Sequence, residues 1–150
     1  MPQSLHRLAV HIVFSTKERR PYVTDDIRAR VHGYQARILQ HLDCHDIVVG
    51  GVADHVHVFC QITRKLAPIK VLEILKKDSS KFVKTLAPDL GLFHWQDGYA
   101  LFSVGADEAD RVRDYVRNQE EHHRTESFQD EHRRLLDANR VAYDERYLWD

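Results

Sequence analysis

Two histidines separated by one valine, His55 and His57, are the residues whose types and spacing most directly suggest chemistry. They lie in an apolar segment, residues 47–62, that is typical of buried β-strands. Because successive strand side chains point to opposite faces, the two imidazoles share one face, with Cα atoms roughly 7 Å apart. The other face is then filled by apolar side chains, namely Val56, Val58, Cys60 and Ile62. Two imidazoles at that separation can converge on one divalent ion.

A tyrosine and a glutamine one helical turn apart, Tyr115 and Gln119, provide the second half of the pattern. They lie in a predicted helix over residues 107–123, at the edge of its apolar stripe, with Arg111 on the same side. Two imidazoles and the Gln119 amide oxygen make a three-ligand metal site with open positions. Such a site suits Mn²⁺ or Mg²⁺ bound to phosphate oxygens and tolerates Zn²⁺, Co²⁺ or Ni²⁺. Together the four residues indicate metal-assisted attack on a phosphodiester.

Each of these residues also has a simpler interpretation. Tyr115 can pack its ring on the sheet and extend its hydroxyl to water. A histidine pair of this kind arises by chance in a chain with 11 histidines. His11 is a candidate core residue, DNA contact or fourth metal ligand. The adjacent pair His122 and His123 is expected to be a solvated helix end.

Composition restricts the class of protein. The 150 residues are 43% hydrophobic and 30% charged, which is typical of one soluble domain, residues 1–150. No segment is apolar enough to span a membrane, and the N-terminus lacks a signal-peptide pattern, so a cytoplasmic protein is expected. The net charge of −1 argues against nucleic-acid coating by bulk charge. Cys44 and Cys60 are expected to be buried free thiols.

The chain is expected to be α+β. Hydrophobic periodicity, turn residues and helix-capping residues predict strands and helices in the order β-α-β-β-α-β, followed by two C-terminal helices. This order favours a ferredoxin-like antiparallel sheet in which the first and third strands are neighbours, so His11 could lie near His57. The predicted strands are Leu5–Phe14, Asp46–Val52, His55–Ile62 and Tyr99–Gly105, and the predicted helices are 25–41, Pro68–Lys84, 107–123 and Phe128–Asn139.

Several segments resemble the HUH-superfamily tyrosine transposases of small bacterial insertion sequences. The most specific are Asp54–Val58, with the histidine pair, and Tyr115–Gln119. Weaker ones extend the likeness over nearly the whole chain, namely His11–Phe14 with Lys17, Arg19 and Arg20, Glu73–Lys81, Phe93–Tyr99 and Tyr143–Trp149.

The resemblance implies a metal-dependent single-stranded DNA transposase, an endonuclease and strand transferase. Tyr115 would attack a DNA phosphodiester to form a 5′-phosphotyrosine link and release a 3′-hydroxyl. A divalent metal, Mg²⁺ or Mn²⁺, would be held by His55, His57 and Gln119. The partners would be single-stranded DNA with hairpins at the element ends and a second copy of the chain, in a homodimer with composite active sites.

The expected DNA contacts are mostly basic residues, namely His11, Lys17, Arg19, Arg20, Lys76, Lys81, Arg111 and Arg117. Arg111 could favour the phenolate or pair with a nearby acid. Trp95 and Tyr99 could stack on bases or belong to the core.

Three other functions remain open at this point. The same site could serve a host-adapted nickase or repeat-processing enzyme. The chain could bind hairpin DNA without cutting it, although the presence of His55, His57, Tyr115 and Gln119 argues against this. A metal-binding ferredoxin-like protein without nucleic acid would leave the Tyr115–Gln119 pair and the basic clusters unexplained.

Overall fold

Four antiparallel strands form one sheet in the order β2-β3-β1-β4. The computed structural model describes residues 2–150. The strands are β1 (Ala9–Ser15), β2 (His45–Val52), β3 (His55–Gln61) and β4 (Ala100–Ser103). The helices are α1 (Asp25–His41), α2 (Pro68–Lys84), α3 (Ala109–Arg117), α4 (Gln119–His122) and α5 (Phe128–Ala138), with 3-10 turns at Lys17–Arg19, Pro88–Leu90 and Ala106–Glu108. The predicted α+β, ferredoxin-like order is confirmed, with β1 and β3 at the sheet centre.

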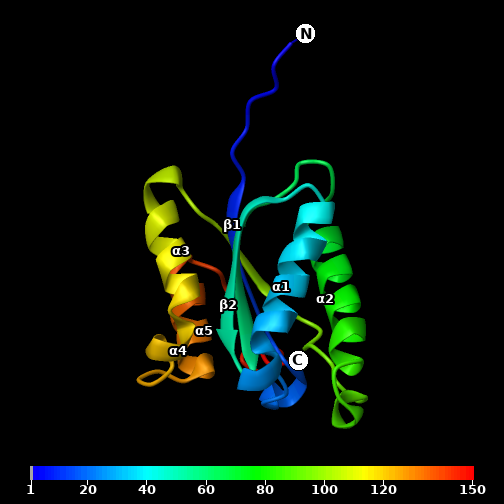
Figure 1. Ribbon diagram of the computed structural model, residues 1–150. Helices are drawn as coiled ribbons and strands as arrows, with labels where there is room; N and C mark the ends of the chain where they lie inside the picture. Colours follow the sequence, from blue (N-terminus) through cyan, green and yellow to red (C-terminus); the bar gives the residue numbers. More distant parts are fainter. Residues whose placement is uncertain (1) are drawn as a thin grey trace.

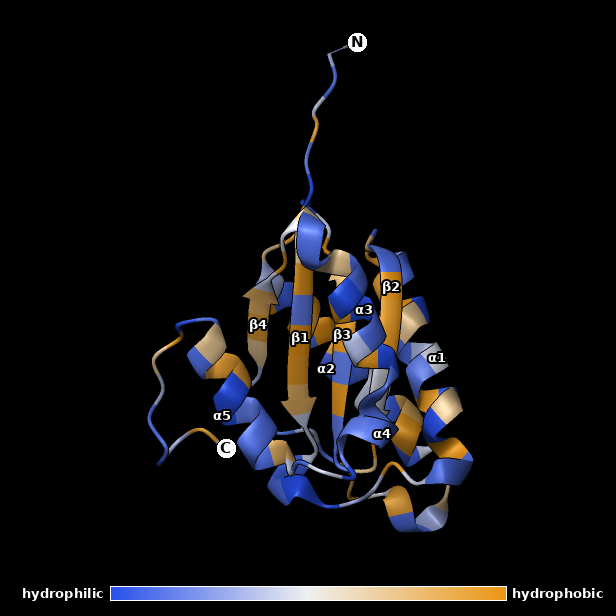
Figure 2. Ribbon diagram, turned by 90° about the vertical axis from the view of Figure 1, so that its left-hand side faces the viewer, coloured by the Kyte–Doolittle hydropathy of each residue, from blue (hydrophilic) through white to orange (hydrophobic). Residues whose placement is uncertain are grey.

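Helices cover both faces of the sheet (Figure 1). On one face α1 and α2 pack on the apolar side of β1 and β3, where the predicted stripe of Val56, Val58, Cys60 and Ile62 is buried. On the other face α3 covers β2 and β3, and α5 covers β1 and β4 (Figure 2). His55 and His57 lie on this second face, as predicted, between the two helices that cover it.

The ends of the outer strands differ from the predicted bounds. The prediction that β1 begins at Leu5 is wrong, because Leu5 is 85% exposed and the strand begins at Ala9. Ala9 pairs with Gln61, the last residue of β3, and Val10 pairs with Ser103, the last residue of β4. Leu8 still accepts a hydrogen bond from the backbone nitrogen of Ile62, 2.8 Å away, but no neighbouring strand continues beyond that point, although the sequence before Ala9 alternates. β4 is likewise confined to Ala100–Ser103.

The predicted helix over residues 107–123 is wrong as one continuous helix. The chain leaves helical geometry at Asn118, where φ is −100° and ψ is 28°, and α3 and α4 lie on either side. At this break the side-chain amide of Gln119 donates to the backbone oxygen of Tyr115, 3.0 Å away. The side chain thus satisfies a carbonyl near the helix end, and the break changes the direction in which Gln119 projects.

A glycine allows α3 to lie directly on the sheet. A Cβ atom at Gly50 in β2 would come within 1.9 Å of the backbone oxygen of Val116. The helix is also held by Arg113, which pairs with Asp46 and lies over the Phe59 ring, 4.8 Å from its centroid. Tyr115 is therefore positioned by a close backbone contact as well as by side-chain packing.

Within residues 2–150, no helix combines the length and apolar character needed to cross a lipid bilayer. Cys44 and Cys60 are buried free thiols, as predicted.

Candidate active site

Three imidazoles from the two central strands meet on the face covered by α3 and α5. His55 and His57 in β3 are 2% and 0% exposed, and His11 in β1 is 5% exposed. Nε2 of His11 lies 2.8 Å from Nδ1 of His57. The predicted proximity of His11 and His57 is thus confirmed, and His11 is a buried, hydrogen-bonded residue.

The orientation of His55 is fixed by the preceding residue. Its Nδ1 atom lies 2.7 Å from the Asp54 carboxylate, which accepts a hydrogen bond from the Nδ1–H group. Although burial would raise the pKa of Asp54, the interaction with His55 holds it below its usual range. The Nε2 atom of His55 then faces inward, 3.4 Å from the amide oxygen of Gln119. The amide oxygen and the imidazole predicted to share a metal are therefore neighbours.

A buried carboxylate from α5, Glu131, lies at the centre of the cluster. Its Oε1 atom is 2.9 Å from Nε2 of His57, 3.0 Å from Nε2 of His123 and 3.5 Å from Nε2 of His55. Burial would raise the pKa of Glu131, but hydrogen bonds with His123 and His57 bring it far below its usual range. Glu131 is therefore ionised although it is fully buried.

Glu131 and His123 were not among the site residues predicted from the sequence. The expectation that His123 is a solvated helix end is wrong, because its side chain is only 10% exposed and contacts Glu131. A signal for Glu131 was present: it is an acidic residue on the same helix face as Phe128 and Leu135, which are buried. No such pattern marks His123, which reaches the site through the turn after α4.

The hydroxyl of Tyr115 lies against this cluster. It donates a hydrogen bond to Oε2 of Glu131, and its ring centroid is 5.7 Å from that of His57. Nη2 of Arg134 in α5 donates to the same hydroxyl over 2.8 Å, and Nε2 of His122 is 3.3 Å away. Burial, together with the charge of Glu131, raises the pKa of Tyr115 well above its usual range.

Two of the buried imidazoles, those of His57 and His11, are held neutral by their surroundings. Burial lowers the pKa of His57 to about 4, and burial next to His57 lowers the pKa of His11 to about 3. Burial would lower the pKa of His123 as well, but its hydrogen bond to Glu131 raises that pKa above its usual value. Neutral imidazole is the form that can bind a metal ion.

The predicted DNA-binding residues do not form one surface. His11 and Arg111 line a cavity of about 330 Å³ beside Tyr115, together with Arg134 and Asn139. Arg111 also forms an ion pair with Glu108, over 2.7 Å, so it pairs with a nearby acid, which is one of the two alternatives that the sequence left open.

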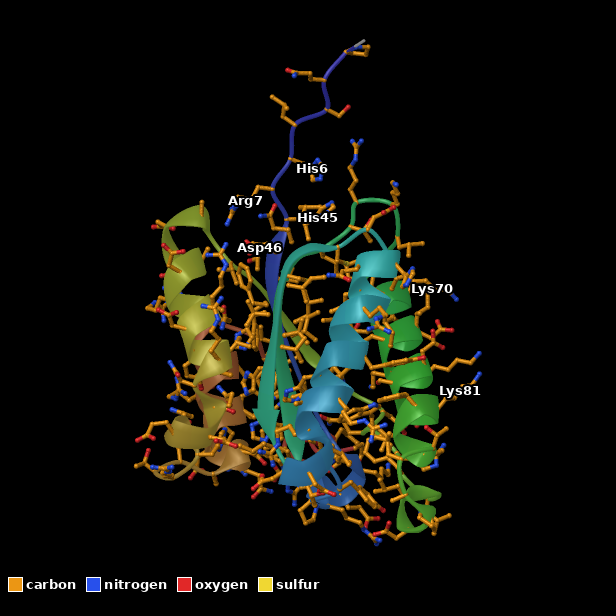
Figure 3. All side chains as sticks on the ribbon, viewed as in Figure 1. His6, Arg7, His45, Asp46, Lys70 and Lys81 are labelled. Atoms are coloured by element: carbon orange, nitrogen blue, oxygen red, sulfur yellow. The ribbon has the colours of Figure 1, made fainter. Side chains whose placement is uncertain are left out.

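Five of the remaining residues interact with their own chain. The ion pairs are Lys17–Asp97 (3.9 Å), Arg20–Glu18 (3.1 Å) and Arg117–Asp114 (3.3 Å), and Arg19 lies over the Trp149 ring. Lys76 donates to the backbone oxygens of residues 97 and 98. Its ammonium group also lies over the Tyr99 ring, 5.8 Å from the ring centroid. Lys81 projects from α2 on the opposite side of the molecule from α3 (Figure 3).

The two aromatic residues considered for base stacking differ. Trp95 belongs to the core, at 6% exposed, and donates to Ser79. Tyr99 is 38% exposed, and base stacking by its ring stays a prediction.

Comparison with known proteins identifies the family. Residues 4–119 match the sequence profile described as transposase IS200-like, which covers well over half of the chain. The chain belongs to the IS200-like transposase family. Its resemblance to the HUH-type tyrosine transposases is thereby confirmed. A comparison with curated protein sequences found no match.

Two solved structures share the fold of this IS200-like transposase. A protein from Deinococcus radiodurans R1 described as a transposase has a TM-score of 0.62 and 18% identity, over 79% of this chain and 98% of the other. A REP-associated tyrosine transposase bound to a REP hairpin has a TM-score of 0.51 and 10% identity, over 77% of this chain and 70% of the other. Membership of a transposase family places the chain among enzymes that cut and join DNA.

Proposed function

We propose that this chain is a metal-dependent single-stranded DNA transposase that cuts and rejoins hairpin-bearing DNA ends, with Tyr115 as the nucleophile. The observation that carries the proposal is the position of the Tyr115 hydroxyl, which contacts Glu131 beside the buried imidazoles of His55 and His57. A phenol directed at a cluster of metal-ligating groups is the arrangement that covalent cutting of a phosphodiester requires. Family membership supplies the class of reaction.

Tyr115 can reach a phosphate through the cavity beside it. In the proposed reaction the Tyr115 oxygen attacks phosphorus, the bond from phosphorus to the 3′-oxygen breaks, and the DNA ends become a 5′-phosphotyrosine and a 3′-hydroxyl. Attack by another 3′-hydroxyl on the phosphotyrosine reverses the exchange, so no external energy source is needed for rejoining. Arg134 donates to the phenolic oxygen and would stabilise the negative charge on it.

The donor set of His55, His57 and Gln119 fits the divalent metal predicted from the sequence. The Nδ1 proton of His55 is committed to Asp54, and the side-chain nitrogen of Gln119 is committed to the Tyr115 carbonyl. Both side chains therefore direct acceptor atoms toward one another, which is what ligands of one cation do. A bound divalent cation would stabilise charge on the phosphate oxygens; Mg²⁺ and Mn²⁺ are the ions predicted from the sequence.

Hairpin DNA is proposed as the partner because a fold relative was solved with a REP hairpin. The same relative favours a second candidate, a host-adapted enzyme that processes repeats with the same chemistry. His11 and Arg111 are the predicted DNA contacts whose position beside Tyr115 best supports that role. A hairpin-binding module without cutting activity is the outcome that a negative cutting test would favour.

The test is covalent capture of DNA. Purified protein is mixed with labelled single-stranded hairpin DNA and Mn²⁺ or Mg²⁺, and a protein–DNA adduct that survives denaturation is measured. We expect the adduct with the native chain and none with Tyr115→Phe, which keeps the ring but lacks the attacking oxygen. Tyr147→Phe is the matched control, because Tyr147 is 65% exposed near the C-terminus. An adduct that persists in Tyr115→Phe would contradict the proposal.

A further inference from the structure

Two imidazoles of the candidate active site, those of His55 and His123, have Nδ1 atoms committed to oxygen atoms of neighbouring residues. Nδ1 of His55 meets the Asp54 carboxylate, and Nδ1 of His123 lies 2.7 Å from the backbone oxygen of Glu126. Carboxylate and carbonyl oxygens can only accept, so both Nδ1 atoms carry the proton. Each Nε2 atom is then directed into the cluster, where it can either carry a second proton and donate to a carboxylate or bind a cation through its lone pair.

Without a second proton on these rings, acceptors would face acceptors in a buried space. The Nε2 atoms of His55 and His123 are directed at Oε1 of Glu131, 3.5 and 3.0 Å away, and the amide oxygen of Gln119 also faces His55. Lone pairs opposed in this way repel each other and cost free energy where water cannot reach them. A cation between them turns the repulsion into attraction, which is the usual reason for such a convergence.

We propose that His123 and Glu131 are ligands of the same divalent cation as His55, His57 and Gln119, so that three imidazoles and one carboxylate join the Gln119 amide oxygen around the ion. This deepens the proposed function and rests on it for the cation. One donor atom from each of the three imidazoles and the carboxylate lies within 4.8 Å of the other three. Adjacent donors about 2.1 Å from an ion are separated by about 3.0 Å in octahedral geometry and by about 3.4 Å in tetrahedral geometry. The distances of 2.9–3.5 Å from Glu131 to the imidazoles match these separations.

Glu131 links the metal site to the nucleophile through its second oxygen. Oε1 faces the imidazoles, whereas Oε2 accepts the hydrogen bond of the Tyr115 hydroxyl. One carboxylate thus fixes the phenol relative to the metal position. Both proposed ligands lie beyond residue 119, where the match to the family profile ends. This part of the metal site therefore belongs to the C-terminal segment of this chain rather than to the matched span.

The donor set also changes the expected metal. Imidazole nitrogen favours transition metals, whereas Mg²⁺ prefers oxygen ligands and retained waters. Of the two ions predicted from the sequence, Mn²⁺ is the better match to three imidazoles and a carboxylate, and Co²⁺ and Zn²⁺ should bind more tightly still.

The test measures metal binding without DNA. Metal-free protein is titrated with Mn²⁺, followed by the paramagnetic resonance of the free ion, and with Co²⁺, followed by visible absorption. Glu131→Gln keeps the shape but removes the charge, and we expect Mn²⁺ affinity to fall roughly 100-fold or more, since even outer-shell changes cost about 10–100-fold. The Co²⁺ spectrum should change as well. Asp130→Asn is the matched control, because it removes one charge from the adjacent, exposed position.

A second variant, His123→Asn, tests the proposal independently in case the Glu131→Gln variant does not fold. Thermal unfolding of each metal-free variant checks the fold. Unchanged Mn²⁺ affinity in both variants would overturn the proposal. Tighter binding in Glu131→Gln would also overturn it, because Glu131 would then compete with the ion rather than bind it.

The His55→Ala, His57→Ala double variant separates this inference from the proposed function. If only that variant loses Mn²⁺, His123 and Glu131 are not ligands but the metal-dependent function stands. If no variant changes binding, the metal part of the proposed function fails too.

Discussion

The Tyr115 hydroxyl has one anion and one cation as immediate partners, and their effects oppose each other. Glu131 accepts a hydrogen bond from the hydroxyl and its negative charge disfavours the phenolate, whereas Arg134 donates to the oxygen and favours the phenolate. A hydrogen bond to a charged group contributes about 1.5–3 kcal/mol, and partial exposure of Arg134 places its contribution at the low end.

We therefore expect Arg134→Gln to slow adduct formation roughly tenfold, measured as the initial rate on hairpin DNA. Arg133→Gln is the control, because the neighbouring Arg133 pairs with Asp130 and Glu145 at the surface. Equal rates for both variants and the native chain would show that Arg134 does not act on the phenol.

Sequence spacing predicts residues that are close along one element, and it fails for residues brought together by packing. His55 and His57 share a strand face, and Tyr115 and Gln119 are one turn apart, so their neighbourhood follows from local geometry. Glu131 and Arg134 reach Tyr115 from another helix, and no periodicity reveals that contact. The catalytic and ligand roles of all these residues remain proposals.

At the scale of elements, the position of α3 depends on the absence of a side chain at Gly50. An alanine there would place its Cβ 1.9 Å from the Val116 oxygen, and a backbone atom cannot rotate away. We expect Gly50→Ala to lower the free energy of unfolding by about 1–3 kcal/mol and to reduce adduct formation about tenfold or more.

Gly33→Ala in α1 is the matched comparison, since nothing lies within 4 Å of the added Cβ. It should stabilise the fold by up to about 1 kcal/mol, because alanine is the better helix former. Denaturant unfolding and the adduct assay check both variants; a Gly50→Ala protein with native stability and cutting would refute this account of α3.

Element existence was predictable, whereas several element ends were not. The alternation of residues before Ala9 continues without strand pairing, because β3 and β4 end at Gln61 and Ser103. The apolar stripe of α3 does not reveal the break at Asn118, which depends on the local hydrogen bonding of Gln119. The first feature is set by the neighbouring strands, and the second accompanies a side-chain hydrogen bond within the segment that hydrophobic periodicity does not show.

At the scale of the whole molecule, one chain brings all the candidate active-site groups together. Tyr115 contacts Glu131, which contacts His57, within the same copy. The resemblance implies instead a homodimer in which the tyrosine of one subunit completes the histidine pair of the other. That shared arrangement stays a prediction. It differs from a site completed within one chain in whether two inactive variants can restore cutting when they are mixed.

Mixing two inactive variants separates the arrangements. If the site is complete in one chain, Tyr115→Phe mixed with the His55→Ala, His57→Ala double variant should recover no cutting. A shared site would give partial recovery, because one site of each mixed dimer would hold native residues only. The measurement is adduct yield on hairpin DNA, after mass analysis has shown whether mixed dimers form. Recovery in confirmed mixed dimers would contradict a site confined to one chain.

The ferredoxin-like order was predictable because each predicted strand and helix pattern agrees with one topology, and that topology places β1 beside β3. The contribution of α5 to the site was not predictable, because the order of elements does not determine which face of the sheet a C-terminal helix covers. It covers the histidine face, where Phe128 stacks on His55 with ring centroids 4.4 Å apart.

The most direct test of the central claim is to locate the covalent bond. The denaturation-resistant adduct is digested with a protease and a nuclease, and the remaining nucleotide is mapped by mass spectrometry. The account predicts a 5′-phosphate linked to Tyr115, in a product that is not formed when divalent metal is removed. A nucleotide attached to any other residue, or DNA cut without a covalent link, would contradict it.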